Sequence, residues 1–290
     1  MRVVQQSVDI RRIGGRIGAE VVGLDLREDL PDAVFDDVHR AFLEFKVLVF
    51  RDQQISDEQQ LAFANRFGPL TEVHPMMRTS TQNAQVIPVD GEDQRADHWH
   101  TDVSFTMTPS LATTLRSVVL PPYGGNTLVA NCAAGYQDLP QPLRKVADTL
   151  WAVHTNRADQ PRLGTARGEA VRRAFMATEY QTAHPVVRVH PESGEPALFL
   201  GGFAQSLVGM TKAQSRPLLE LLQSYVTRPE NVVRWTWRVG DVLIFDNRNT
   251  QHYAVNDYGD LKRVLSRVSV TGDVPFGLDG RRSFVVEEDE

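Results

Sequence analysis

The sequence contains a single cysteine, Cys132, so no disulfide bond can form within the chain. It has no run of about 18 apolar residues, the length that a transmembrane helix requires. The opening residues, MRVVQQSVDIRRIGG, lack the apolar stretch of a signal peptide. These absences predict a cytoplasmic protein without a membrane partner, in which Cys132 is a small buried apolar residue.

An excess of positive charge is also missing. The formal net charge is −6 and the isoelectric point is near 5.8. A general nucleic-acid-binding protein would present a basic domain, so we expect no nucleic-acid partner. The acidic balance still allows a small basic pocket for an anionic substrate.

Two amphipathic helices are predicted in the first quarter of the chain. Residues 31–45 carry apolar side chains at helical spacing. Ser56 and Gln59 form the pattern of a capping box, which opens a helix reaching about residue 67. A third helix is predicted over residues 133–150, and a fourth over residues 211–227.

Short apolar runs of strand character dominate from residue 84 onward. Within VVRWTWR we expect Trp235 and Trp237 on a core face and the alternating arginines on a solvated face. Many strands with few helices predict an antiparallel barrel or jelly roll with the early helices packed outside. We expect a single domain over residues 1–290, with the Arg-rich segment 157–183 as a lid over the barrel mouth.

The most informative motif is His100-Thr101-Asp102, followed far downstream by His252. Side chains two apart on a strand share a face, so His100 and Asp102 would point the same way. Two histidines and one carboxylate are typical of non-heme Fe(II) oxygenases. His98 shares that face, so spacing alone also allows a His98–His100 pair of the kind that binds zinc. Hydrogen-bonded structural histidines are the third interpretation.

Longer strings resolve this choice through a resemblance. The runs WHTDVSF, GGNTLVAN, HPVVRVHP and DNRNTQHYAVNDY, with Arg263 eleven residues after His252, resemble the taurine dioxygenase / TfdA-type family. Members are Fe(II)- and 2-oxoglutarate-dependent dioxygenases that use O2, and the resemblance extends from about Ile13 to Pro275. It implies a mainly β fold with α-helices, in which a double-stranded β-helix (jelly roll) forms the core.

The same resemblance implies roles for single residues. His100, Asp102 and His252 match the iron ligands of the family. Arg263 and Thr127 match the residues that bind the distal carboxylate of 2-oxoglutarate. A guanidinium suits that task because its planar fork bonds both carboxylate oxygens, which a lysine cannot do.

Four further positions match the substrate pocket of the family. They are His74, Val103, Phe203 and Arg267. Arg267 lies four residues beyond Arg263, so a strand would present both on one face. His74 and Arg267 together would form a cationic pocket for a small anionic organic substrate.

The chain departs from the family pattern at three positions. Met77 stands where taurine-specific members have a tyrosine, which should weaken recognition of a small amino-sulfonate. Phe245 replaces a tryptophan conservatively, and Ser266 replaces a histidine without an evident consequence. The runs LWAVHTNR and HPVVRVHPESGE look more like the alkylsulfatase-type members.

Three functions fit these observations. The leading one is hydroxylation of the carbon next to a sulfate or sulfonate group, which yields an aldehyde, sulfate or sulfite, succinate and CO2. The alternative is the same chemistry on a carboxylate or phosphate substrate, such as a phenoxyalkanoate or a biosynthetic intermediate. The third is a barrel that only binds metal or ligand, and it gives no reason for a 2-oxoglutarate clamp of Arg263 and Thr127.

The resemblance also favours a homo-oligomer. Asp246 and Asn247 either orient a ligand or make a turn.

Overall fold

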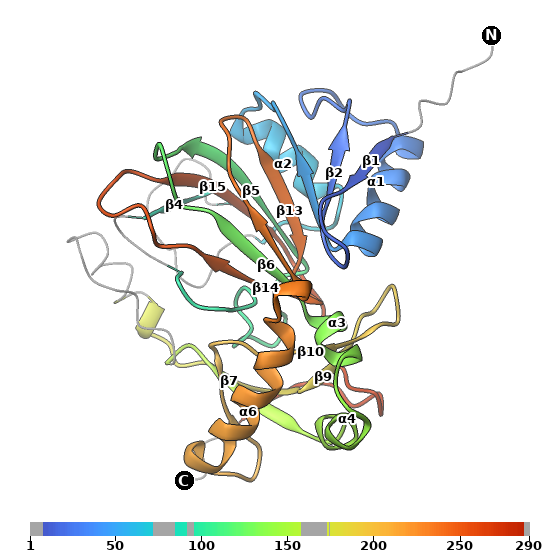
Figure 1. Cartoon of the computed structure of the whole chain (residues 1–290), viewed down its shortest axis with the longest axis vertical. Helices are drawn as coiled ribbons and strands as arrows, with labels where there is room; N and C mark the ends of the chain where they lie inside the picture. The colour runs from blue at the N-terminus through green and yellow to red at the C-terminus, as the bar shows by residue number, and fades with distance from the viewer. Residues whose placement is uncertain (1–7, 72–84, 92–95, 158–172, 174, 287–290) are drawn as a thin grey trace.

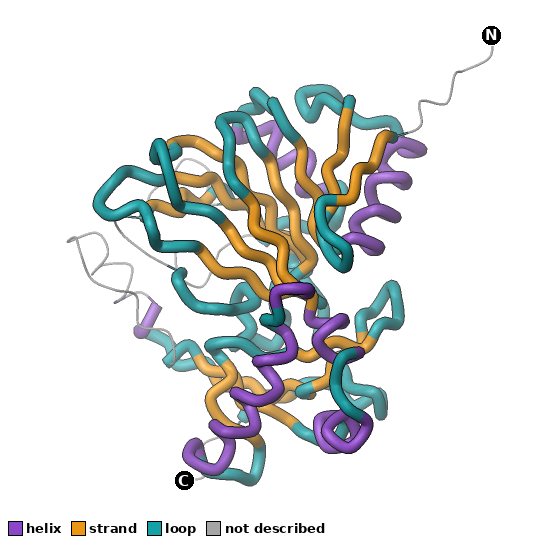
Figure 2. The backbone as a smooth tube through the Cα atoms, in the orientation of Figure 1, coloured by secondary structure: helices purple, strands orange, loops and turns teal. Residues whose placement is uncertain are grey.

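A computed structural model describes residues 8–71, 85–91, 96–157, 173 and 175–286 of the chain. Strands make up most of the regular structure, and helices lie against the sheets (Figures 1 and 2). The expected mainly β fold with helices is therefore confirmed. In the described part of the chain, no helix has both the length and the apolar character needed to cross a membrane.

A seven-stranded sheet forms the upper part of the molecule in Figure 1. Its neighbouring strands are antiparallel, except for one parallel pair formed by the second and third strands in the order given. The order is β1 (Asp9–Arg12), β2 (Ala19–Val22), β3 (Val47–Phe50), β13 (Val242–Asp246), β5 (Ala112–Val119), β15 (Val264–Val270) and β4 (Ile87–Asp90).

Two helices cover one face of this sheet (Figure 1). Helix α1 spans Asp32–Phe45 and buries Phe35, Val38 and Phe42, as its apolar spacing predicts. Helix α2 spans Asp57–Asn65 and begins with the predicted capping box. There the Ser56 hydroxyl accepts from the Gln59 amide, and the Gln59 side chain accepts from the Ser56 amide. Both expected helices are confirmed.

A three-stranded sheet packs against the other face of the large sheet. Its order is β12 (Val232–Trp235), β6 (Thr127–Asn131) and β14 (Thr250–Ala254). Val129 and Trp235 from this sheet share one apolar cluster with Leu115, Leu243 and Leu265 of the large sheet. Trp237 belongs to the same cluster, whereas Arg234 and Arg238 are exposed, so the predicted alternation of core and solvated faces is confirmed.

The lower part of the molecule combines small sheets and helices (Figure 1). Its β-structure consists of β11 (Ala204–Leu207), β7 (Trp151–Thr155), β8 (Gln181–Pro185) and β16 (Phe284–Val285) in one sheet, with the hairpin β9 (Val187–Val189) and β10 (Pro196–Leu198). Its helices include α3 (Cys132–Gln137), α4 (Gln141–Ala147), α6 (Lys212–Val226) and a 3-10 turn, Pro229–Asn231. Helix α6 packs against β11 and α3.

A predicted helix and the predicted lid both fall in this part of the chain. The single helix expected over residues 133–150 is wrong, because Pro140 lacks an amide hydrogen and separates α3 from α4. Most of the expected lid, residues 158–172 and 174, lies outside the described residues. Its end, residues 181–183, begins strand β8, and the lid itself stays a prediction.

Two buried histidines link β7 and β8. His154 and His184 are fully buried, with their ring centroids 5.0 Å apart. Their Nδ1 atoms bond the hydroxyls of Ser104 and Ser283, at 3.0 and 2.7 Å. Burial lowers the pKa of His154 to about 3, and burial, with the Arg188 guanidinium nearby, holds the pKa of His184 well below its ordinary value. Both rings are therefore neutral in the folded protein.

We expect mild acid to destabilise the protein through this pair. In the unfolded chain both histidines titrate near 6.5, so below that pH the unfolded state binds more protons than the folded state. The free energy of unfolding should fall by up to about 1.4 kcal/mol per pH unit for each histidine. Urea denaturation between about pH 7 and about pH 5 measures this. The variant His154→Gln should show a shallower pH dependence, and equal slopes would contradict the assignment.

Candidate metal centre

The candidate centre starts from one backbone contact between distant segments. His100 and His252 form a single antiparallel bridge, in which each amide donates to the other's carbonyl at 3.1 and 2.8 Å. Their imidazole centroids lie 4.1 Å apart. His252 belongs to β14, whereas residues 98–102 form no strand beyond this bridge.

The sequence-based expectation that His100 and Asp102 share the face of a strand is therefore wrong. The amide of Asp102 donates to the side chain of Asn247 rather than to a neighbouring strand. The backbone then turns, and Val103 adopts a left-handed conformation with φ 46°. The turn, instead of strand alternation, brings the Asp102 carboxylate to the histidines.

The three side chains converge on one buried point. Oδ1 of Asp102 lies 3.8 Å from Nε2 of His100 and 3.7 Å from Nε2 of His252. One ligand atom from each of the three residues lies within 4.8 Å of the others, close enough to share a metal ion. Within the described part of the chain, the group that meets this criterion does not include His98. The backbone carbonyl of His98 accepts from Nδ1 of His100 at 2.9 Å, which leaves Nε2 of His100 as the unprotonated nitrogen.

Electrostatics put these groups in the protonation state that binds metals. Burial lowers the pKa of both His100 and His252, so the imidazoles are neutral. Burial alone would raise the pKa of Asp102, but its neighbours, among them the Arg267 guanidinium and the Thr113 hydroxyl, outweigh burial and hold that pKa below its ordinary value. Two neutral imidazoles and one carboxylate bind a divalent cation without first releasing protons, so these residues fit a metal such as Fe(II).

A second buried cation, Arg263, lies immediately before strand β15 and not within it, so the expectation that one strand presents Arg263 and Arg267 on one face is wrong. The Arg263 side chain is 3% exposed. Its Nε donates to the Gly125 carbonyl at 2.8 Å and its Nη2 to Oγ1 of Thr127 at 3.3 Å. Gly125 has φ 64°, and a Cβ there would lie 2.9 Å from Cδ of Arg263, so this approach requires glycine. Among the described residues, no carboxylate forms an ion pair with Arg263. A buried guanidinium without an anion is a binding site for one.

The register of the small sheet relates this cation to the histidines. Val129 pairs with His252 and Thr127 pairs with Ala254, two residues further along β14. Side chains two apart on a strand share a face and lie roughly 7 Å apart. Thr127 therefore sits on the same face as His252, at a distance that a five-carbon dicarboxylate can bridge.

The remaining predicted pocket residues divide into two groups. On β15, Nη1 of Arg267 lies 3.6 Å from Oδ1 of Asp102. Val103 and Phe203 belong to one buried apolar cluster with Phe105 and Phe175. The ring of Phe203 stands edge-on to that of His100, with centroids 6.0 Å apart. The structure thus brings Arg267, Val103 and Phe203 to the triad. His74 and Met77 lie outside the described residues.

The departures at Phe245 and Ser266 have different surroundings. The Phe245 ring packs on His252 with centroids 4.5 Å apart and supports it from the core. The Ser266 carbonyl accepts from the Gln60 side chain of α2 at 3.0 Å. Neighbouring residues on a strand point to opposite faces, so the Ser266 side chain points away from the face that carries Arg267.

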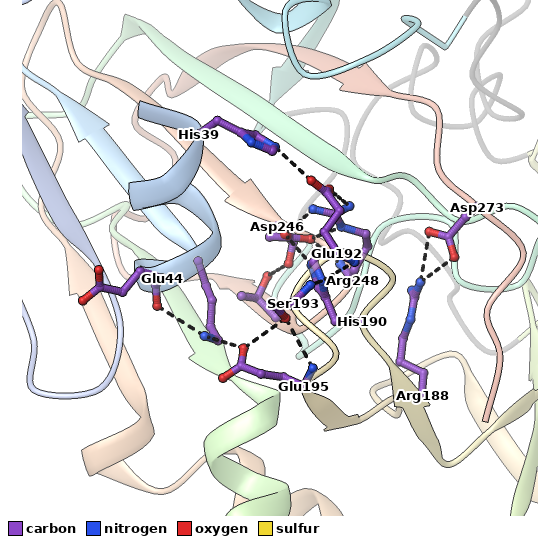
Figure 3. A network of polar contacts seen from close by, with 12 residues as sticks. His39, Glu44, Arg188, His190, Glu192, Ser193, Glu195, Asp246, Arg248 and Asp273 are labelled. Carbon is purple, nitrogen blue, oxygen red and sulfur yellow. Dashed lines mark hydrogen bonds and ion pairs between the residues drawn. The ribbon is translucent and has the colours of Figure 1, made fainter. Parts of the chain in front are cut away.

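Sequence reasoning named Asp246 only as a residue that orients a ligand or makes a turn, and it overlooked the buried ionic network around that residue (Figure 3). Asp246, at the end of β13, accepts from the Arg248 backbone and guanidinium and from His190 at 2.7 to 3.0 Å. Arg248 also pairs with Glu192. Asp246, Arg248 and His190 are all nearly fully buried. The DNR run hinted at this role, but the partner His190 lies 56 residues away in sequence and carries no local signal.

Comparisons with known proteins place the chain among oxygenases. The family described as "Taurine catabolism dioxygenase TauD, TfdA family" matches residues 9–269. An alpha-ketoglutarate-dependent sulfate ester dioxygenase of Pseudomonas putida is 46% identical, over 96% of this chain and 94% of that protein. An alkylsulfatase of Acinetobacter baylyi is 42% identical, over 95% and 88%. A solved taurine dioxygenase structure from Burkholderia xenovorans superposes with a TM-score of 0.83 at 38% identity, covering 98% of this chain and 96% of that one.

The ionic network predicts a large stability effect at Asp246. The variant Asp246→Ala leaves the Arg248 guanidinium buried beside one partly exposed partner, Glu192. Removing one member of a buried ion pair typically costs about 3–5 kcal/mol, and urea denaturation measures the loss. The matched control is Asp9→Ala, because the Asp9–Arg11 pair is exposed and should contribute little. Equal losses in the two variants would contradict the role given to the network.

Proposed function

The chain belongs to the TauD, TfdA family of dioxygenases, and on that premise we propose that it hydroxylates the carbon next to the sulfate group of a small sulfate ester. It is an Fe(II)- and 2-oxoglutarate-dependent dioxygenase by family. The observation that carries the substrate proposal is the position of Arg267. Its guanidinium stands beside the triad, in a chain whose relatives are named for sulfate esters and alkyl sulfates.

His100, Asp102 and His252 are the residues that would hold the iron. Their neutral imidazoles and single carboxylate match what Fe(II) prefers, and three ligands leave positions free for other molecules. When bound, iron with 2-oxoglutarate and O2 supplies the oxidising power for hydroxylation, and 2-oxoglutarate leaves as succinate and CO2. The protein's own residues bind, orient and shield the reactants.

Arg263 and Thr127 would bind the distal carboxylate of 2-oxoglutarate. Arg263 is buried and already directed by Gly125 and Thr127. The Thr127 hydroxyl also accepts from the indole of Trp237 at 2.9 Å, so its own proton is available for an incoming carboxylate. The spacing along β14 supports this role, because it lets the keto acid end reach the triad.

Arg267 would bind the sulfate group of the substrate. One of its terminal nitrogens faces Asp102, and its Nε has no partner among the described residues. The guanidinium therefore keeps donors for an anion next to the triad. Val103 and Phe203, with Phe105 behind them, present an apolar wall that suits an alkyl chain and excludes water. His74 is proposed as a second anion contact from the sequence alone.

The products follow from the bond that is oxidised. One oxygen atom of O2 enters succinate, and the other is inserted into a C–H bond of the carbon that bears the sulfate group, which converts it to a hydroxyl-bearing carbon. The resulting hydroxylated ester breaks its carbon–oxygen bond to sulfate and leaves an aldehyde. A sulfonate would give sulfite by the same route, and a phenoxyalkanoate would give a phenol.

Further expectations about the fold, the assembly and the location belong to this proposal. We propose that the seven- and three-stranded sheets form the double-stranded β-helix core, and their shared apolar cluster supports this. A single domain, a lid over residues 157–183, a homo-oligomeric state and a cytoplasmic location remain predictions from the sequence.

A substrate panel tests the proposal. The protein is supplied with Fe(II), ascorbate and 2-oxoglutarate and offered alkyl sulfates, alkanesulfonates, taurine or phenoxyacetates. We expect alkyl sulfates to stimulate succinate formation most, with sulfate released in equal amount. Stimulation by phenoxyacetates alone would assign the alternative substrate class. No 2-oxoglutarate turnover with any compound, from iron-loaded protein, would contradict the reaction itself.

The two arginines predict separable kinetic defects. Arg267→Ala should raise the KM for the sulfate ester about ten- to hundredfold, the cost of one or two charge-assisted hydrogen bonds, and change the KM for 2-oxoglutarate little. Arg263→Ala should show the reverse pattern. Steady-state kinetics with each compound varied in turn measures both. If either variant raises both KM values together, the roles assigned to the two residues are wrong.

A further inference from the structure

The two carboxylate oxygens of Asp102 have different surroundings. Oδ1 faces the Nε2 atoms of His100 and His252 at 3.8 and 3.7 Å. Oδ2 accepts a short hydrogen bond, 2.6 Å, from the hydroxyl of Thr113 on β5. One oxygen is therefore turned to the candidate metal centre, and the other is held by the protein.

Thr113 belongs to a closed ring of hydrogen bonds that begins and ends at Asp102. The Asp102 amide donates to Oδ1 of Asn247 at 3.2 Å. Nδ2 of Asn247 donates to the Thr113 hydroxyl at 2.9 Å, and that hydroxyl donates to Oδ2 of Asp102. A backbone amide can only donate, which fixes the orientation of the Asn247 side chain. Because Asn247 donates to Thr113, the single hydroxyl proton of Thr113 is directed to Asp102.

The fold fixes this ring and shields it from water. Thr113 and Asn247 are fully buried, and Asp102 is 3% exposed. Thr113 pairs with Phe245 across β5 and β13, and the Asn247 amide continues that ladder to the Leu111 carbonyl at 2.9 Å. The adjacent Asp246 side chain anchors the same turn in the ionic network of Figure 3. Water cannot replace a lost donor at so buried a carboxylate.

We propose that Thr113 and Asn247 are positioning residues that make Asp102 a ligand through one oxygen only. The inference rests on the proposed metal site. A carboxylate that binds a metal through both oxygens takes up two coordination positions. The Thr113 hydroxyl keeps Oδ2 occupied, so that Oδ1 alone remains for the metal and more positions stay open for cosubstrate and O2.

Removing the hydroxyl should loosen the carboxylate. The terminal torsion of an aspartate has a broad, roughly two-fold energy profile, so hydrogen bonds to its oxygens determine its orientation. Thr113→Val keeps the shape of the side chain but leaves Oδ2 buried without a donor. Loss of a contact that orients a metal ligand typically weakens metal binding about ten- to hundredfold. Thr113→Ser keeps the hydroxyl and should restore binding.

Thr114 offers a matched control on the same strand. It is fully buried like Thr113 but points to the opposite face, where its hydroxyl accepts from Gln60 at 3.2 Å and donates to the Val268 carbonyl at 3.4 Å. Thr114→Val removes a buried hydroxyl of the same kind without touching Asp102. It should lower stability and leave metal affinity unchanged.

Calorimetric titration of metal-free protein with Mn(II), a divalent ion that is not readily oxidised, tests the proposal without turnover. We expect Thr113→Val to raise the Kd about ten- to hundredfold, with Thr113→Ser and Thr114→Val within a few-fold of the parent. Should Thr113→Val not fold, Thr113→Ala removes the same hydroxyl without adding a methyl group. Equal Mn(II) affinity of the parent and the hydroxyl-free variant, or equal weakening in Thr114→Val, would overturn the positioning role. Parent protein that binds Mn(II) no better than His100→Ala would instead refute the metal site.

Discussion

The site depends on one backbone contact, the bridge between His100 and His252. These residues are 152 positions apart (252 − 100), yet they exchange both amide-to-carbonyl hydrogen bonds. Closing so long a loop costs chain entropy, which grows slowly with loop length. Packing of the large sheet against the small one offsets that cost, because β13 and β14 on either side of the closing turn belong to the two different sheets. The bridge places the two imidazoles side by side.

Charge is organised around the turn that leads into this bridge. Asp246 is the first residue of the turn. Its carboxylate accepts hydrogen bonds from Arg248 and His190, and all three side chains are buried. Asn247 reaches from the turn to Asp102, and the Thr250 carbonyl accepts from the Thr101 hydroxyl at 2.8 Å. A buried ion pair is weak evidence for stability by itself. Here the network holds a short connection that contacts Asp102 through Asn247 and leads directly into β14, the strand that carries His252.

Local features of the fold could be read from the sequence. Helix α1 and the capping box at Ser56 and Gln59 are set by neighbours along the chain, so periodicity and capping rules predict them. Pro140 also indicates a break, but the prediction of one long helix followed the apolar spacing on both sides of it. The ends of a helix depend on single residues, whereas apolar periodicity averages over many residues and can hide a break.

The site was predictable in its residue types but not in its geometry. The motif strings named His100, Asp102 and His252, and the structure brings these three together. The strand that was to carry the first pair does not exist, because the chain turns at Val103. Nothing in the sequence points to Thr113, since a threonine within a strand is unremarkable and its contact with Asn247 spans 134 positions. Contacts of that kind require the register of β5 on β13, which local patterns do not encode.

A crystal structure of the protein with Mn(II) and N-oxalylglycine, an unreactive analogue of 2-oxoglutarate, tests the central claim most directly. We expect anomalous density for the metal between Nε2 of His100, Oδ1 of Asp102 and Nε2 of His252. We also expect the distal carboxylate of the analogue to bind Arg263 and Thr127, which leaves Arg267 for the substrate. Metal bound at another group, or the distal carboxylate bound to Arg267, would contradict the claim.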